Sequence, residues 1–184
     1  IAMVGVNEDA NKVVPSCTQK DGNKLLIIGD TKGEFGASLY MKKMYHTVAG
    51  THPEVDYKKE LALWNTVIEA NKSSLVEAAK DVNLGGIAVS LAKMAVVGNH
   101  GVDVKVDVED KKDIFSETLS RAILEVKPEN VDAVAKVAAA QGISCTVIGT
   151  VGGEDIKIND IKSHLNTASD VYFNKFREVI EQDL

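Results

Sequence analysis

Few residues of this sequence can stack on a base or a sugar, because aromatic side chains make up only 5% of its 184 positions. An excess of positive charge is also lacking: 27 acidic residues outnumber 21 lysines and arginines, the formal net charge is −6, and no cluster of lysine and arginine is interleaved with aromatic residues. A negatively charged chain repels polyanions. We therefore expect no nucleic-acid partner.

Cysteine is almost absent, and the two that occur, Cys17 and Cys145, stand far apart and outside any metal-binding spacing. The four histidines form no HExxH or paired spacing, which disfavours a zinc site. No apolar run approaches the roughly 20 residues that cross a bilayer, so no membrane partner is expected. Reduced thiols and the lack of a signal-peptide pattern favour a cytoplasmic location.

Small aliphatic residues are abundant, and the hydrophobic fraction of 45% is enough for one domain with a continuous core. We expect a single α+β domain over residues 1–184, in which helices pack on a mixed β-sheet. The strand-like opening at Ile1 further indicates a piece of a larger protein. Apolar runs and alternation predict strands at residues 23–31, 102–108, 119–126 and 143–151. Helical periodicity predicts helices at residues 56–70, 86–98 and 128–142.

The helix expected at 56–70 carries its largest apolar residues on one face. Tyr57, Leu61, Trp64 and Ile68 recur at helical spacing, which predicts that this face packs inward. Trp64 is then the main anchor of the helix.

Other expected details depend on single patterns. A capping-box spacing at residues 74–77 predicts a short helix before Asp81. The glycine pair at 152–153 predicts a hairpin that reverses the chain between two strands. A last helix is expected after a cap at Asn159 or Asp160.

The stretch "DVNLGG" places a glycine pair at the start of the helix predicted over 86–98. Glycines there let the backbone approach a ligand, and the helix dipole favours an anion such as phosphate. Asp81 and Asn83 offer oxygen ligands of the kind that Mg²⁺ takes. The alternative is that Asp81 caps the helix, while Gly85 and Gly86 let the helix pack closely on the sheet. No Walker pattern accompanies the pair.

A second polar stretch, "DIFSETLSR", precedes the strand predicted at 119–126. Ser116, Glu117, Thr118 and Arg121 offer hydrogen bonds to a phosphoribosyl group, or form an ordinary loop with a Glu to Arg pair. The glycine-spaced turn at 29–38 is another place where ligands gather in α/β proteins.

Taken in order, four stretches resemble one known family. They are "IAMVGVNEDANKVV", "LLIIGDTKGEFGASLY", "AAKDVNLGGIAVSLAKMA" and "FSETLSRAILEVKPEN". Together they resemble the last domain of the synthetase subunit of phosphoribosylformylglycinamidine synthase, a domain of the AIR synthetase C-terminal type. The third stretch is similar to the family pattern A-H-D-V-S-E-G-G-L-A, and the resemblance runs essentially from end to end.

The resemblance implies a parent enzyme that converts formylglycinamide ribonucleotide to the amidine with MgATP and ammonia. Its partners would be the rest of the synthetase chain, a glutaminase subunit, a small accessory subunit and the small-molecule ribonucleotide substrate. The catalytic histidines and most ATP ligands would lie outside this chain, which alone would be inactive. The alternatives are another ATP-binding enzyme related to AIR synthetase, or a domain that serves only structure and subunit contact.

Carried over residue by residue, the resemblance makes Asp81 a metal-binding aspartate and assigns the 116–118 loop to substrate. Two departures, Lys80 in place of the family's His and Leu84 in place of Glu, imply that any nucleotide site in this half is degenerate. The residues expected to bind nucleotide or substrate are Asp81, Asn83, Gly85, Gly86, Ser116, Glu117 and Thr118.

Overall fold

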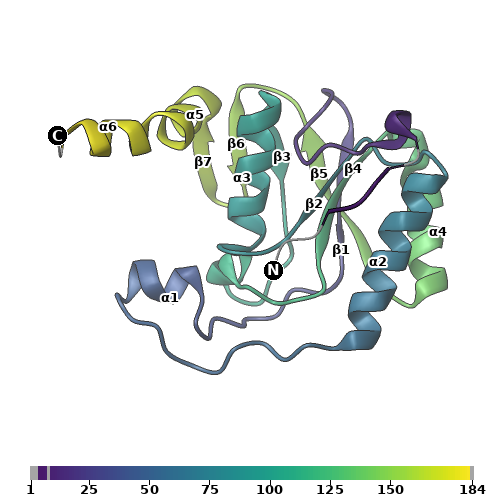
Figure 1. The fold of residues 1–184 in the computed structure, drawn as a ribbon, viewed down its shortest axis with the longest axis horizontal. Coiled ribbons are helices and arrows are strands. Elements are labelled where there is room, and N and C mark those ends of the chain that lie inside the picture. The colour runs from purple at the N-terminus through teal and green to yellow at the C-terminus, as the bar shows by residue number, and fades with distance from the viewer. Residues whose placement is uncertain (1–3, 8, 183–184) are drawn as a thin grey trace.

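Residues 4–7 and 9–182 are described by the computed structural model, and they form a seven-stranded sheet with helices on both faces (Figure 1). No helix within these ranges is long and apolar enough to cross a membrane. The strands are β1 (Lys24–Ile28), β2 (Ala78–Asp81), β3 (Val102–Val104), β4 (Ala122–Val126), β5 (Cys145–Val151), β6 (Asp155–Ile158) and β7 (Ile161–His164). The α-helices are α1 (Leu39–Met44), α2 (Tyr57–Lys72), α3 (Gly86–Gly98), α4 (Val131–Gln141), α5 (Leu165–Phe173) and α6 (Lys175–Gln182). Short 3-10 helices span Ala10–Lys12, Lys111–Phe115 and Pro128–Asn130.

The sheet order is β2-β4-β1-β5-β3-β6-β7, and every neighbouring pair is antiparallel except β3 with β6. This confirms the predicted α+β class with a mixed sheet. β1 lies between β4 and β5, and its Leu25, Leu26 and Ile28 have no exposed surface. An uninterrupted apolar run suits this position, because a central strand is covered on both faces.

Two hydrophobic clusters cover the two faces of the sheet. Leu25 of β1 points into the cluster under α3, which includes Leu91. The next residue, Leu26, points into the other cluster, where it joins Leu63 of α2 and Val134 of α4. Because successive side chains of a strand alternate between faces, the sheet separates these clusters.

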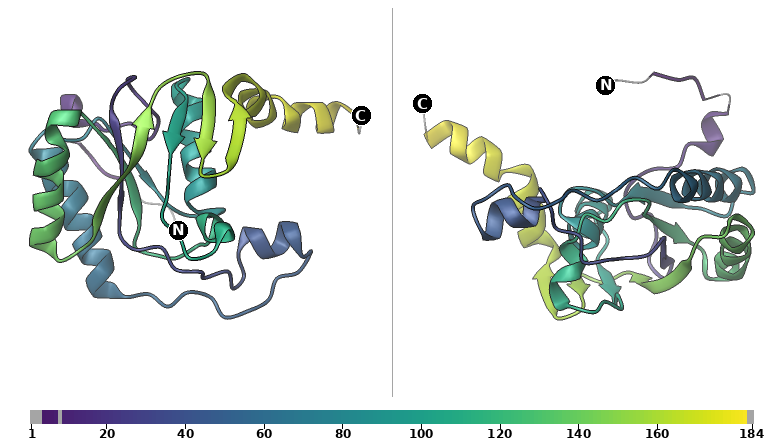
Figure 2. Two further views of the ribbon diagram at one scale, coloured as in Figure 1. Left: turned by 180° about the vertical axis from the view of Figure 1, so that it is seen from behind. Right: turned by 90° about the horizontal axis from the view of Figure 1, so that it is seen from below.

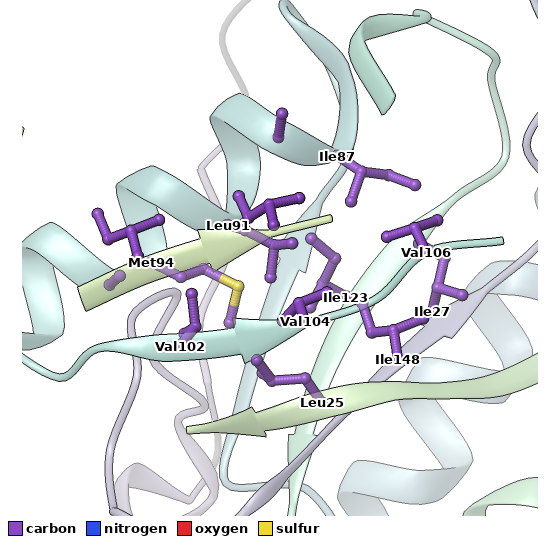
Figure 3. Packing of buried hydrophobic residues seen from close by; sticks show 14 of the residues in the cluster. Leu25, Ile27, Ile87, Leu91, Met94, Val102, Val104, Val106, Ile123 and Ile148 are labelled. Carbon is purple, nitrogen blue, oxygen red and sulfur yellow. The ribbon is translucent and has the colours of Figure 1, made fainter. Parts of the chain in front are cut away.

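The helix predicted at 86–98 is confirmed as α3 with the same bounds. Its Ile87, Leu91 and Met94 lie over the sheet, close to the valines of β3 (Figure 3). The helix ends at Asn99, which adopts a left-handed conformation with φ of 57° and donates its amide to the carbonyl of Ala95. The helical periodicity of residues 86–98 therefore predicted both α3 and the face that it buries.

The position of α2 is also confirmed, but the prediction of its buried face is wrong. The buried residues are Leu63, Thr66 and Ala70, which pack toward α4 and the sheet. These side chains are small or slender, so the helix can lie close to its neighbours. The residues predicted to be buried, which we call the outer stripe of α2, are exposed: Tyr57, Leu61, Trp64 and Ile68.

Two local predictions near glycine and serine turns are wrong. Residues 78–81 form strand β2 instead of a helix, because the edge of β4 offers ladder partners, and the Glu77 amide already donates to the Glu125 carbonyl. Gly152 and Gly153 do turn the chain with positive φ, but β5 and β6 do not pair. Strand β3 lies between them, and the amide of Gly152 donates to the carbonyl of Gly101.

The C-terminal part also differs from its prediction. Residues 161–164 form β7, which pairs with β6, so the cap of the following helix is His164 and not Asn159 or Asp160. The side chain of Asn159 instead accepts a hydrogen bond from the amide of Val106 and donates one to its carbonyl. The strand predicted over 102–108 is therefore shorter than expected, and β3 ends at Val104.

Several segments stand apart from the sheet. Helix α6 extends away from it beyond α5, and α1 is joined to α2 by a long loop (Figure 2). Residues 4–7 have no regular secondary structure and a 3-10 helix begins at Ala10, so no strand forms in the described part of the opening, and residues 1–3 and 8 lie outside it. The predicted unit of strand, helix and strand over 119–151 exists as β4, α4 and β5, with β1 between its two strands.

Candidate functional site

The loop at 116–118 meets the N-terminus of α3 through the side chain of Glu117. Its Oε1 accepts a hydrogen bond of 2.9 Å from the backbone amide of Gly85. The same oxygen accepts one of 2.8 Å from the amide of Leu39, the first residue of α1. A carboxylate of the chain itself therefore binds the first amide of the glycine pair, and it contacts two helix N-termini at once.

The glycine pair brings α3 into contact with the loop that precedes Glu117. Gly85 and Gly86 both have positive φ, 83° and 68°. A Cβ atom on Gly86 would lie 2.5 Å from the carbonyl oxygen of Ser116 and 2.6 Å from that of Ile114. Gly86 is thus required for close packing, as the alternative predicted, although its close neighbour is this loop and not the sheet. The other half of that alternative is wrong: Asp81 does not cap α3, whose N-cap is Gly85 without a side-chain cap.

Asp81 lies at the outer end of β2, with 65% of its side chain exposed. One carboxylate oxygen accepts a hydrogen bond of 3.0 Å from the ammonium group of Lys80, and the other accepts one of 2.5 Å from the Asn83 side-chain amide. The backbone carbonyl of Asn83 accepts a hydrogen bond from the amide of Gly86. Both oxygens of Asp81 therefore have donors within the chain.

These surroundings do not fit a magnesium ion held by this chain alone. Mg²⁺ requires oxygen ligands in an octahedral arrangement, whereas Lys80 places a positive charge beside Asp81. No group of three or more His, Cys, Asp or Glu side chains that could hold a metal occurs in residues 4–7 and 9–182.

Thr118 and Ser116 are both buried. The Thr118 hydroxyl donates to the carbonyl of Lys32 at 2.7 Å and accepts from the amide of the same residue at 3.2 Å, which fixes the loop after β1. The Ser116 hydroxyl has no exposed surface and no hydrogen-bond partner among the described residues. Their predicted contact with substrate stays a prediction.

Arg121 holds the loop in shape, which agrees with the structural alternative, but its partners are backbone carbonyls and a hydroxyl instead of the expected glutamate. The residue is 2% exposed, and its guanidinium donates to the carbonyls of Ser116 and Thr118 at 2.8 and 2.9 Å and to the Thr31 hydroxyl at 3.0 Å. Burial lowers the pKa of Arg121 to about 10, and the negative charge of Glu34 opposes this shift. Because it binds the carbonyls on both sides of Glu117, Arg121 positions that carboxylate.

The glycine-spaced turn at 29–38 borders a hollow of about 1160 Å³. The loop at 51–56, the start of α2 and the residues before β5 form the other walls. On that side the hydroxyl of Ser144 donates to Asp30 at 2.6 Å, and the hydroxyl of Ser120 donates to Glu60 at 2.7 Å. The turn also meets the 116–118 loop, because the amide of Glu117 donates to the carbonyl of Glu34 at 3.0 Å. The structure therefore brings Gly85, Gly86, Glu117 and the turn together, whereas the side chain of Asp81 forms hydrogen bonds only with Lys80 and Asn83 among the described residues.

Comparison with known proteins gives consistent results. The phosphoribosylformylglycinamidine synthase subunit PurL of Sulfurovum sp. is 53% identical over all 184 residues, and that of Nitratiruptor sp. is 52% identical. In both cases the chain spans 25% of the relative's length.

Solved structures show the same fold at low sequence identity. PurL from Thermotoga maritima complexed with ATP gives a TM-score of 0.69 with 20% identity, over 87% of this chain and 28% of that one. PurL from the same organism complexed with FGAR gives 0.71 with 18% identity, over 87% and 30%. The expected fold of the AIR synthetase type is thereby confirmed. The family described as AIR synthase related protein, C-terminal domain, matches residues 20–160, and the chain belongs to that family.

Proposed function

We propose that the chain is one region of a synthetase subunit of phosphoribosylformylglycinamidine synthase. The whole polypeptide would convert formylglycinamide ribonucleotide to formylglycinamidine ribonucleotide, using ATP and ammonia derived from glutamine. The observation that carries the proposal is the 53% identity to a PurL subunit over every residue of this chain. A cytoplasmic location belongs to the same proposal.

Within that enzyme, the part played by this chain is to build the fold and not to hold the nucleotide. Glu117 supports this assignment, because its carboxylate accepts the hydrogen bond of the Gly85 amide and places negative charge beside the N-terminus of α3, where a phosphate would bind. Like charges at such close range repel strongly when they are partly buried. ATP would then be bound by residues outside these 184.

A magnesium ion at Asp81 would need most of its ligands from elsewhere in the polypeptide. Asp81 can supply one carboxylate, on which Lys80 and Asn83 already occupy one acceptor site of each oxygen. The predicted roles of Ser116, Glu117 and Thr118 in holding substrate would likewise require the 116–118 loop to move, since two of these side chains are buried.

The proposed partners are a separate glutaminase subunit and a small accessory subunit. A multi-subunit assembly is supported by a structural neighbour described as PurLQS from Thermotoga maritima, with a TM-score of 0.71. Its identity to this chain is 18%, so it contributes the likeness of fold.

The proposal is tested with the full-length polypeptide that contains this chain. Purified together with its glutaminase and accessory subunits, it should form the amidine in a reaction that depends on ATP and glutamine. The 184-residue chain alone should form none, even with ammonia supplied directly. An inactive full-length enzyme, or an active isolated chain, would contradict the proposal.

A further inference from the structure

Helix α2 is apolar on two opposite faces. Its inner face, with Leu63 and Ala70, is buried against α4 and the sheet. Because a helix turns about 100° per residue, the outer stripe, spaced by four, three and four residues, lies on the opposite side. A helix that is apolar on both sides is normally covered on both sides.

The outer stripe has the composition of a protein interface. Trp64 is 59% exposed and Tyr57 is 81% exposed, and these residue types are enriched at the centres of interfaces. Exposed polar side chains, among them Lys58, Asn65 and Glu69, flank the stripe as a rim. The arrangement of an apolar centre and a polar rim is typical of a docking surface.

The end of the outer stripe borders a hollow of about 640 Å³. Val6 and Ile68 are its large apolar residues, and Asn7, Asp9, Lys12, Asn71 and Lys72 supply a polar part of the lining. Val6 is itself almost fully exposed. The polar rim of the stripe therefore continues around the end of α2.

We propose that the outer stripe of α2 docks on another part of the same synthetase polypeptide. The inference rests on the proposed function and names a contact that the proposed function leaves open. The chain spans 25% of the relatives that it matches, so about three quarters of such a polypeptide is available as an occupant. That remainder is covalently tethered to the stripe, and tethering gives it a high effective concentration over any separate molecule.

The test measures whether position 61 is covered in the intact polypeptide. Leu61→Cys is introduced into the full-length polypeptide and, separately, into the 184-residue chain, and the rate of maleimide labelling at that position is read by peptide mass spectrometry. Leu61 is 59% exposed, so this change leaves the core intact. Labelling should be at least about tenfold slower in the full-length polypeptide, because a docked surface excludes the reagent.

Val97→Cys provides the matched control. Val97 lies on α3 and is 49% exposed, the same exposure as Ile68 of the stripe. It should label readily in the isolated chain and lose less reactivity than position 61 in the full-length polypeptide. Equal slowing at both positions would contradict a contact specific to α2, and equal rates of Leu61→Cys in the two proteins would overturn the proposal.

Dilution separates the two possible occupants. Protection by the same polypeptide is independent of concentration, whereas protection by a second copy disappears as the protein is diluted, and that result would overturn the proposal. Amidine formation is measured on the same full-length preparations. If the full-length polypeptide forms the amidine but position 61 labels as fast as in the isolated chain, only the docking inference is contradicted. If position 61 is protected but no amidine forms, only the proposed function is contradicted.

Discussion

Glu117 and Gly85 are 32 residues apart in the chain, yet the carboxylate of one accepts the backbone amide of the other at 2.9 Å. Through the same oxygen, Glu117 also binds the amide of Leu39. The N-termini of α1 and α3 are thus joined by one side chain. Each such contact satisfies an amide that has no partner within its own helix.

Replacing Glu117 by alanine should lower the free energy of unfolding by about 2 kcal/mol, because two backbone amides lose their charged hydrogen-bond acceptor. Glu117→Gln keeps an oxygen acceptor but not the charge, so it should lose about half as much. Urea unfolding of the two variants measures the difference. Equal stability of Glu117→Ala and the unmodified chain would show that the bridge contributes nothing.

Gly86→Ala should destabilise the chain by about 3 kcal/mol or more, since the added Cβ meets backbone oxygens at 2.5 and 2.6 Å. Gly153→Ala is the matched control. Gly153 also has positive φ, 79°, but nothing lies within 4 Å of its Cβ position, so only about 1 kcal/mol of backbone strain is expected. The same loss of thermal stability in both variants would mean that the glycine pair does not serve packing.

Arg121→Lys should lower the free energy of unfolding by about 2 kcal/mol or more, although the positive charge is kept. A lysine cannot reach the two carbonyls and the Thr31 hydroxyl with one planar fork, so buried acceptors lose their partners. Arg177→Lys, at an exposed position of α6, should change stability by less than about 0.5 kcal/mol. The thermal unfolding temperatures of both variants show whether the three hydrogen bonds of the guanidinium, and not only its charge, stabilise the fold.

The thiol of Cys145 should react slowly with alkylating reagents. Burial raises its pKa from 9.0 to about 11, so the folded state keeps the thiol proton between these values while the unfolded state releases it. This group therefore stabilises the folded state below pH 9.0, and that contribution is lost as the pH rises toward 11. In a Cys17→Ser variant, the native alkylation rate should keep rising up to about pH 11. A plateau near pH 9 without denaturant would disagree with the burial of Cys145.

Sequence patterns correctly predicted the elements whose conformation depends mainly on residues close by in the chain. The glycine pair and the apolar spacing of 86–98 predicted α3 with its bounds, and Gly142 ends α4 with positive φ as expected. The start and end of these helices depend on residues a few positions away, so they can be predicted from the sequence alone.

Features that depend on distant partners were not predictable. Residues 78–81 are a strand because β4 presents an open edge, and the buried face of α2 depends on where α4 packs. Sequence spacing identified the outer stripe of α2 as one apolar face, but not that this face is exposed. The same holds for Glu117, whose residue type indicated a ligand contact while its actual partners lie 32 and 78 positions away.

Titration calorimetry of MgADP into the 184-residue chain asks whether Glu117 closes the α3 N-terminus to phosphate. If it does, no saturable heat is expected at millimolar nucleotide, either for the unmodified chain or for Asp81→Ala. Saturable binding that Asp81→Ala abolishes would contradict it, because this chain would then hold a working nucleotide site.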